Sequence, residues 1–563
     1  MNARKILCLM AAVLMLSGCS KGVDGSQASS KAAESSGKTD SSVSDYDNTT
    51  TEPETDKPEF DLNDSVIGFS QESGFYDSGF SLELTANEGE KIYYTTDGTD
   101  PRTSATREEY TAPIEIKDRS NDPNVVSAVP TEMISGNFNE FSFGEGDFWC
   151  NKKAPSDNAV DKCTVIRASS EKSDGSVSQS FSGSFYIGSA EEHIKGLKES
   201  CEAAGHDLAV MNITMDYADL FDSKIGIYVK GDIFSKALED YKASGESIEN
   251  ETARQLDANY KQRGKEWERD CHIELNEISA EGNVTNALSQ DCGIRIQGNY
   301  SRSDLQKGFR LYARKKYGEK KFNYEVFEGL KNASDETIDS FKTLTLRAGG
   351  NCAFTAKFND TYWQSLMTEL DGSTKASRPC VVYLNGEYWG LYVLEEDYSD
   401  NYFESHYGVN KDDVVVYKGD AETYQSGYKL DEGKLPEGET DEGYFFKELT
   451  DFFASHRDLS AQADYEEFSK LVDTDSVRDY FLAEVWINNK WDWPGKNWSM
   501  WKVQNTDSSN EYADGKWRFM FYDVEFGGVS GEGDAWTNTM KEDNYKPKGL
   551  LDTDTCLLYT SPS

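Results

Sequence analysis

The sequence is short of positive charge and of the residues that bind zinc. Its 58 Lys and Arg are outnumbered by 101 Asp and Glu, which gives a formal net charge of −43. A basic face for nucleic acid or for an anionic membrane is therefore not expected, and a phosphate site would need a metal ion and local Lys or Arg. The chain holds only five His, and its ten Cys form no Cys-x-x-Cys pair, so a zinc site is not expected either.

The spacing of the cysteines leaves their redox state open. Cys150 and Cys163 are close in sequence and could form a disulfide outside the cell. Buried free thiols are an equally good interpretation, and the spacing does not decide between the two.

The apolar run at the start of the chain is too short to cross a bilayer. Residues 6–15 follow two basic residues, which predicts a targeting signal and not a membrane span. The Leu-Ser-Gly-Cys19 that follows resembles the bacterial lipobox, in which the Cys is lipidated and becomes the mature N-terminus. The resemblance implies that residues 1–19 are a lipoprotein signal and that Cys19 anchors an extracytoplasmic protein at a membrane. An ordinary secretory signal is the alternative.

Residues 20–62 lack the apolar side chains of a folded core. They are rich in Ser, Thr, Asp and Glu, a composition that predicts a disordered tether. Such a tether would let the folded part stand off the membrane surface.

Residues 63–190 consist of short β segments separated by turns. The segment Phe80–Thr85 alternates with period two, and a second β segment, from Lys91 to Thr96, ends in an Asp-Gly turn. This pattern predicts a small antiparallel β-sandwich. The Tyr-Tyr-Thr-Thr-Asp-Gly98 sequence resembles the immunoglobulin-like module at the C-terminus of chitobiases and hexosaminidases. The resemblance implies a spacer or auxiliary domain, which could also bind cell-wall glycan.

The most informative stretch runs from Asp475 to Gly528. Asp475 is placed as the N-cap of a helix with one apolar face. Pro and Gly then interrupt any helix, so the Asp492-Trp-Pro-Gly-Lys-Asn497 segment is expected to be a loop. A strand, an Asp-Gly turn signal and a second strand follow, and the second strand ends at Asp523.

This order of elements is the layout of a protein-kinase catalytic centre. There, one Asp orients the acceptor hydroxyl, while an Asn and a second Asp hold magnesium on the ATP phosphates. Phosphoryl transfer depends on positioning and charge neutralisation, and oxygen ligands suit magnesium. Each piece alone is common by chance, so the prediction depends on their order.

Residues 205–550 predict a mixed domain in which strands are interrupted by one long helix. The helix is expected from Thr355 to Leu370, because an apolar residue recurs on one face, and Asp360 lies on it. A hairpin with an Asn385-Gly turn follows. Lys307 begins a strand and could neutralise phosphates, although a solvated lysine at a strand edge is the more ordinary interpretation.

Several segments together carry a third resemblance. They are Ile294–Arg302, Lys307–Leu311, Tyr383–Glu396, Asp492 with Asn497, and Lys516–Asp523. They resemble the CotH family, which are atypical protein kinases first associated with spore coats and also found in secreted bacterial proteins. The resemblance implies an α+β multidomain chain, in which an antiparallel β-sandwich precedes a two-lobed protein-kinase-like domain.

The resemblance also implies the cofactors, the partner and the site. ATP and magnesium would be the cofactors, and a Ser or Thr hydroxyl of a cell-surface protein the acceptor. Glu525 stands where the family often has a second Asp, and Asn359, beside Asp360, stands where Arg is usual. The implied residues are catalytic Asp492, ATP-binding Lys307, Asp360 and Glu396, and metal-binding Asn497, Asp523 and Glu525.

The last residues of the chain differ from the rest of the predicted kinase-like domain. Residues 551–563 do not continue the family pattern, so the kinase-like domain is expected to be incomplete at its C-terminus.

The rival function is a non-catalytic surface protein that uses the kinase-like scaffold and the sandwich for binding or adhesion. A glycosidase is a weaker option, because no recognisable carboxylate pair is present.

Overall fold

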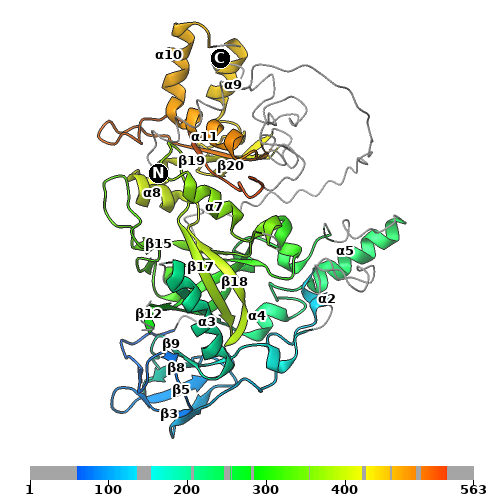
Figure 1. The fold of residues 1–563 in the computed structure, drawn as a ribbon, viewed down its shortest axis with the longest axis vertical. Helices are drawn as coiled ribbons and strands as arrows, with labels where there is room; N and C mark the ends of the chain where they lie inside the picture. Colours follow the sequence, from blue (N-terminus) through cyan, green and yellow to red (C-terminus); the bar gives the residue numbers. More distant parts are fainter. Residues whose placement is uncertain are drawn as a thin grey trace.

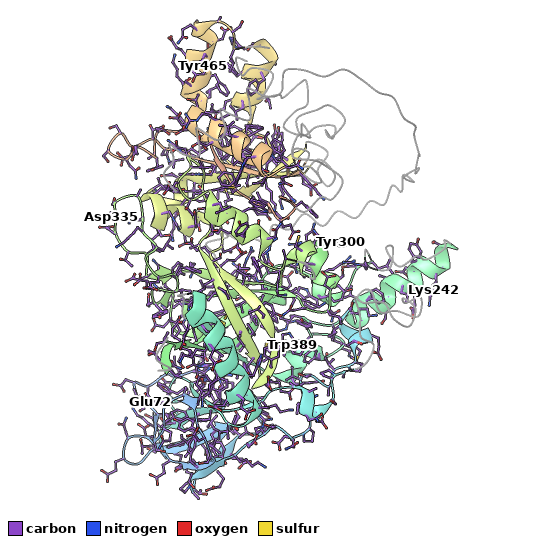
Figure 2. All side chains as sticks on the ribbon, viewed as in Figure 1. Glu72, Lys242, Tyr300, Asp335, Trp389 and Tyr465 are labelled. Atoms are coloured by element: carbon purple, nitrogen blue, oxygen red, sulfur yellow. The ribbon has the colours of Figure 1, made fainter. Side chains whose placement is uncertain are left out.

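The computed structural model describes residues 60–135, 154–204, 208–245, 254, 256–279, 284–353, 356–420, 427–456, 459–489, 493 and 496–528. Cys19, Cys150, Asp492 and nearly all of the predicted tether lie outside these residues. The β module lies at one end of the molecule, a β-barrel in the middle and a helical part at the other end (Figure 1). Glu72 and Tyr465 mark the two ends (Figure 2).

The N-terminal part is a module of short strands, as predicted. Its main sheet has the order β2-β9-β8-β5-β6, and β1–β4 and β3–β7 form two smaller pairs. Leu82, Ile92, Ile166 and Phe185 are buried between these sheets and form the core of the module. The strands are β1 (Gly68–Phe69), β2 (Gly74–Phe75), β3 (Phe80–Leu82), β4 (Leu84–Thr85), β5 (Lys91–Thr95), β6 (Glu108–Glu109), β7 (Ile114–Ile116), β8 (Cys163–Glu171) and β9 (Phe181–Tyr186).

The central part is a closed barrel of seven strands in the order β10-β11-β12-β13-β16-β18-β17. The barrel closes where β17 pairs in parallel with β10, which leaves no free sheet edge. The predicted Asn-Gly turn joins β17 and β18, with φ of 48° at Asn385 and 78° at Gly386. The strands are β10 (Leu208–Thr214), β11 (Arg269–Ile278), β12 (Val284–Gln297), β13 (Gly308–Tyr312), β16 (Thr343–Arg347), β17 (Ser377–Leu384) and β18 (Glu387–Glu395).

Strand β16 shows how the barrel separates its core from its outer face. Leu344 and Leu346 are completely buried in the barrel core. Because side chains alternate along a strand, Thr343, Thr345 and Arg347 lie on the outer face. Helix α3 (Ser189–Ala204) packs against β10, and α5 (Gly231–Ser244) projects from the side of the molecule (Figure 1).

Helix α7 (Asn359–Leu366) is shorter than predicted, and its apolar face points outward. Phe358, Tyr362 and Leu366 are 60%, 47% and 45% exposed. The buried face of this helix carries Asp360 and Gln364, which form hydrogen bonds with each other. The predicted helix is therefore present, but its buried face is polar, because Asp360 bonds to segments that are distant in sequence.

The C-terminal part contains a four-stranded sheet of order β20-β19-β21-β22, with several helices among its described residues. Its core includes four fully buried tryptophans, Trp493, Trp498, Trp501 and Trp517. Asp473, and not Asp475, caps α11, because its carboxylate accepts from the backbone N–H groups of the first turn. The elements are β19 (Val414–Asp420), β20 (Tyr428–Glu432), α9 (Lys447–Ser455), α10 (Gln462–Leu471), α11 (Thr474–Trp486), β21 (Lys496–Val503) and β22 (Arg518–Met520).

Buried polar contacts join the N-terminal module to the barrel. Asp291 on β12 binds Arg102 at 2.6 Å and Arg167 at 2.9 Å, and both arginines belong to the module. Glu387 on β18 accepts from the backbone N–H groups of residues 125 and 127, at 2.6 and 2.7 Å. The module is therefore docked on the barrel. Within the described part of the chain, no helix combines the length and the apolar composition needed to cross a bilayer.

Candidate active site

Two site residues adopt a backbone conformation that is unusual outside glycine. Asn497 on β21 has φ of 59°, and Asp523, just after β22, has φ of 56°. The two strands are antiparallel, with Ser499 opposite Met520, so both residues lie at the same end of the sheet. A non-glycine residue in the left-handed region is disfavoured by about 1–3 kcal/mol and is common at functional sites.

A single arginine gathers three carboxylates at this end of the sheet. Arg347, the last residue of β16, places its Nη2 atom 2.7 Å from Oδ1 of Asp523 and 3.0 Å from Oε2 of Glu525. Its Nη1 atom lies 3.3 Å from Oδ2 of Asp360 on α7. Burial by itself would lower the pKa of Arg347, but the three acids hold it well above its usual value. The guanidinium thus links the barrel, α7 and the segment after β22.

Asp360 positions the segment that carries Asp523. Its side chain is 3% exposed, and its Oδ1 atom accepts from the backbone N–H of Val524 at 2.7 Å. Its Oδ2 atom accepts from Gln364 at 3.1 Å and also contacts Arg347. Because both carboxylate oxygens are engaged within the protein, Asp360 acts by positioning other groups.

Glu525 is also engaged within the protein. Its Oε1 atom accepts from the backbone N–H and the side-chain Nδ2 of Asn351, at 3.1 and 2.7 Å. Its Oε2 atom lies against Gly350, where a Cβ would collide with it and where φ is 55°. Burial, and then the charge of Asp523, raise the pKa of Glu525 to about 7, although Arg347 opposes the shift. Both oxygens of Glu525 are therefore used to hold Asn351 and Arg347.

Asp523 remains the most accessible acid of the group. Its side chain is 27% exposed, compared with 3% for Asp360 and 2% for Glu525. Burial by itself would raise the pKa of Asp523, but the charge of Arg347, its hydrogen bond and the nearby Lys418 lower it below the usual value. Asp523 is therefore ionised at neutral pH.

Two lysines add positive charge around these acids. Lys418 on β19 stacks over the ring of Tyr522 at 4.0 Å and hydrogen-bonds to its hydroxyl. Lys375 binds Glu395, the last residue of β18, at 2.7 Å. The site therefore concentrates three cations in a chain whose formal net charge is −43.

Comparison with protein families gives two matches. Residues 71–129 match the family model of the chitobiase/β-hexosaminidase C-terminal domain, and residues 294–555 match that of the CotH kinase protein. The chain carries a CotH kinase domain. The resemblances to the chitobiase module and to the CotH family are thus confirmed, in the same order along the chain. No curated protein matches the chain.

The CotH match begins within β12, so β10 and β11 precede it although they complete the barrel. A kinase-family domain implies that ATP is used and that a protein is the substrate. The site on Arg347, Asp360 and Asp523 lies inside the matched residues.

The predicted site residues of the CotH domain divide into three groups. The structure brings Asp360, Asp523 and Glu525 together on Arg347, and it places Asn497 at the same end of the sheet. Asp492 lies outside the described residues. The remaining two, Lys307 and Glu396, lie elsewhere.

Lys307 lies outside this cluster and is not solvated. Its side chain is completely buried, and Nζ donates to the backbone oxygens of Ile134 and Asp304, both at 2.6 Å. It also stacks against Tyr228 and Tyr260, and burial holds its pKa well below the usual value. In the described part of the chain, Asp360 pairs with Arg347 and not with Lys307.

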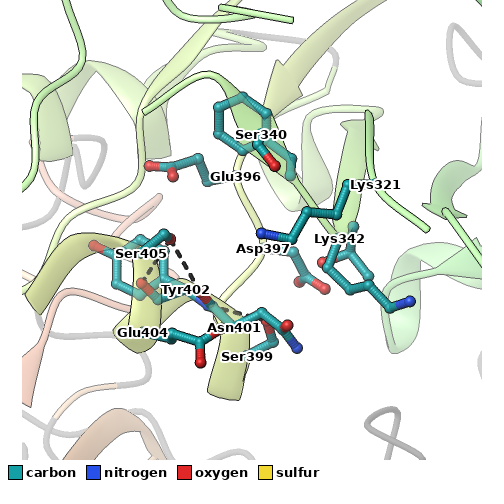
Figure 3. A pocket seen from close by; sticks show the side chains of 12 residues that line it. Lys321, Ser340, Lys342, Glu396, Asp397, Ser399, Asn401, Tyr402, Glu404 and Ser405 are labelled. Carbon is teal, nitrogen blue, oxygen red and sulfur yellow. Dashed lines mark hydrogen bonds between the residues drawn. The ribbon is translucent and has the colours of Figure 1, made fainter. Parts of the chain in front are cut away.

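Glu396 lies at the crossover after β18, beside a cavity of about 90 Å³. It accepts from the backbone N–H of Ala376 at 2.9 Å and bonds to His406 at 2.8 Å. Figure 3 shows Glu396 and Lys321 around this space. Thr343 also lines the cavity and lies on the same face of β16 as Arg347. Residues on one face of β16 therefore border both the cavity and the acidic cluster.

Sequence reasoning missed Arg347. The sequence does contain a pattern that indicates Arg347. It is the outward-facing residue at the end of an alternating strand, and the helix of Asp360 follows. Lys307 was favoured because the CotH resemblance implies that it contacts the phosphates, as a lysine does in protein kinases.

Proposed function

We propose that the chain is an extracytoplasmic, lipid-anchored kinase that transfers the γ-phosphoryl group of ATP to a Ser or Thr hydroxyl of a surface protein. The observation that carries the proposal is the contact of Arg347 with both Asp360 and Asp523. In protein kinases a strand cation pairs with a helix acid near the metal-binding Asp. The CotH match supports the same reaction.

In this proposal Arg347 takes the place of the usual lysine. It is a fork of N–H donors that stays charged, which suits contact with phosphate oxygens. Asp360 holds the guanidinium and the Val524 backbone in one arrangement. Lys418 adds a second positive charge near Asp523. Arg347 and Lys418 would bind and orient the phosphates, while Asp360 keeps Arg347 in place.

The residues present fit a divalent metal ion of the magnesium type. Asp523 offers an ionised, partly exposed carboxylate, and Asn497 offers an amide oxygen at the same end of the sheet. Glu525 fits less well, because both of its oxygens are already engaged. Within the described ranges, no group of three or more His, Cys, Asp or Glu could hold a metal by itself. A bound metal would neutralise phosphate charge, and phosphate oxygens would complete its ligands.

Asp492 is proposed to orient the acceptor hydroxyl. It precedes Asn497 by the Asp-x-x-x-x-Asn spacing. The lipobox-like sequence ending at Cys19 supports the proposed membrane anchor outside the cytoplasm. Binding of cell-wall glycan by the sandwich remains a secondary proposal that depends on its resemblance to the chitobiase module.

The experiment is transfer of the γ-phosphoryl group from labelled ATP, with magnesium, by the full chain. The acceptors are surface proteins extracted from the parent cell. Asp492→Ala and Asp523→Ala should abolish labelling. Asp240→Asn, which alters an exposed ion pair on α5, is the matched control and should label as the wild type does. A folded wild type that neither binds ATP with magnesium nor labels any protein would leave the non-catalytic binding protein as the better account.

A further inference from the structure

Two buried cysteines face each other in the wall of the barrel. Strands β11 and β12 form a long antiparallel hairpin in which Cys271 lies directly opposite Cys292. Their Sγ atoms are 3.4 Å apart, and the two residues are 1% and 0% exposed. The flanking pairs, such as His272 with Asp291, keep the same register.

The backbone already has the geometry that a disulfide needs. Directly opposite residues of an antiparallel pair have Cα atoms about 4.5–5.5 Å apart. A disulfide spans Cα separations of roughly 4.4–6.8 Å, so the bond would form without movement of the strands.

Three other described cysteines have their sulfur atoms beside oxygen atoms. The Sγ atoms of Cys163, Cys352 and Cys380 donate to oxygen atoms, at 3.5, 3.3 and 3.7 Å. Among the cysteines whose side chains the structure describes, only Cys271 and Cys292 have their sulfur atoms in contact with each other.

We propose that Cys271 and Cys292 form a cross-strand disulfide in the mature protein. This inference relies on the extracytoplasmic location proposed above, because disulfides persist in oxidising compartments. The oxidant is a disulfide, either of a thiol oxidase or of glutathione. One thiolate attacks it to form a mixed disulfide, and the second thiolate displaces the reduced oxidant. The two cysteines lose two protons and two electrons, and the oxidant gains them as two thiols.

The bond forms before the barrel closes. In the folded protein both thiols are buried, and burial raises the pKa of Cys292 well above its usual value. Because the thiolate is the attacking species, the closed barrel would react slowly with an oxidant or a reductant.

The disulfide fixes the part of the barrel on which the N-terminal module docks. Asp291 is next to Cys292, and it binds Arg102 and Arg167 of the module. A register slip of one residue would turn Asp291 to the other face of the sheet. Oxidation of the hairpin thus sets the docking surface early in folding.

The test begins with the full chain exported by its own signal. Free thiols are alkylated at harvest, and the protein is then digested without reductant and analysed by mass spectrometry. We expect one linked peptide pair that contains Cys271 and Cys292, with the loss of two hydrogens, whereas Cys352 and Cys380 should be alkylated once the protein is unfolded. Recovery of Cys271 and Cys292 as alkylated thiols would overturn the proposal.

A second measurement uses the reduced full chain, refolded with or without a glutathione redox pair. The oxidised form should melt roughly 5–10 °C higher than the reduced form. A double variant, Cys271→Ala with Cys292→Ala, should lose this difference, whereas Cys380→Ala, which alters another cysteine of the barrel, should keep it. Equal melting of the oxidised and reduced wild type would contradict the proposal. Binding of ATP by the same samples is measured separately, so failure of the kinase proposal is distinguishable.

Discussion

Replacement of Arg347 by Met tests the organisation of the site most severely. The side chain of Arg347 is 12% exposed and contacts Asp360, Asp523 and Glu525 at 2.7–3.3 Å. Arg347→Met would leave three carboxylates close together without the cation that contacts all of them. Removal of one partner from a buried ion pair destabilises a protein by about 3–5 kcal/mol. We expect a loss of this size in the free energy of unfolding, together with loss of ATP binding.

The assay combines urea unfolding of the full chain, followed by tryptophan fluorescence, with calorimetric titration of ATP and magnesium. Arg347→Lys keeps the charge but not the forked geometry, so it should give an intermediate loss of stability and weaker binding. Adding Glu525→Gln to Arg347→Met removes one stranded carboxylate, so the double variant should be no less stable than the single one.

Arg478 offers a matched control. It also contacts three carboxylates, those of Asp371, Asp475 and Asp479, but its side chain is 54% exposed. Arg478→Met should therefore change stability by less than about 1 kcal/mol. The reasoning is refuted if Arg347→Met is as stable as Arg478→Met and binds ATP with the affinity of the wild type.

Three further predictions concern buried charges. Burial raises the pKa of Glu484 on α11 to about 8. The free energy of unfolding of the wild type should therefore fall by up to about 5 kcal/mol as pH rises from about 4.5 to 8. Glu484→Gln should reduce this pH dependence, measured by urea unfolding at pH 5 and pH 9. Lys307→Met should reduce the free energy of unfolding by about 1–3 kcal/mol. The Kd of the folded variant for ATP, measured by calorimetry, should equal that of the wild type, and weaker binding would mean that Lys307 contributes to the ATP site. Burial by itself would raise the pKa of Asp291, but Arg167, His272 and Arg102 lower it. The stability that Asp291 contributes is therefore present above its usual pKa and is lost as pH falls. Asp291→Asn should speed proteolysis between the module and the barrel, and an unchanged digestion pattern would contradict its docking role.

Local signals in the sequence predicted much of the fold. The Asn385-Gly turn, the strands of the module and the strand that ends before Asp523 each depend on neighbouring residues, and the structure has them. The N-cap of α11 was placed two residues late, because Asp473 and Asp475 are equally good caps by residue type.

Contacts between distant segments could not be predicted in the same way. Closure of the barrel depends on the pairing of β10 with β17, which are far apart in sequence. The outward apolar face of α7 depends on what Asp360 bonds to, and its partners come from β16 and from the segment after β22. Lys307 was favoured over Arg347 because the contacts of Arg347 with Asp360 and Asp523 join segments that are distant in sequence.

The central claim is that the cluster around Arg347 and Asp523 binds the phosphates of ATP. The most direct measurement is calorimetric titration of a non-hydrolysable ATP analogue with magnesium into the full chain, for the wild type, Asp523→Ala and the exposed control Asp240→Asn. The account predicts saturable, magnesium-dependent binding to the wild type and to Asp240→Asn, and no binding to a folded Asp523→Ala. Equal binding by all three proteins, or none to a well-folded wild type, would contradict it.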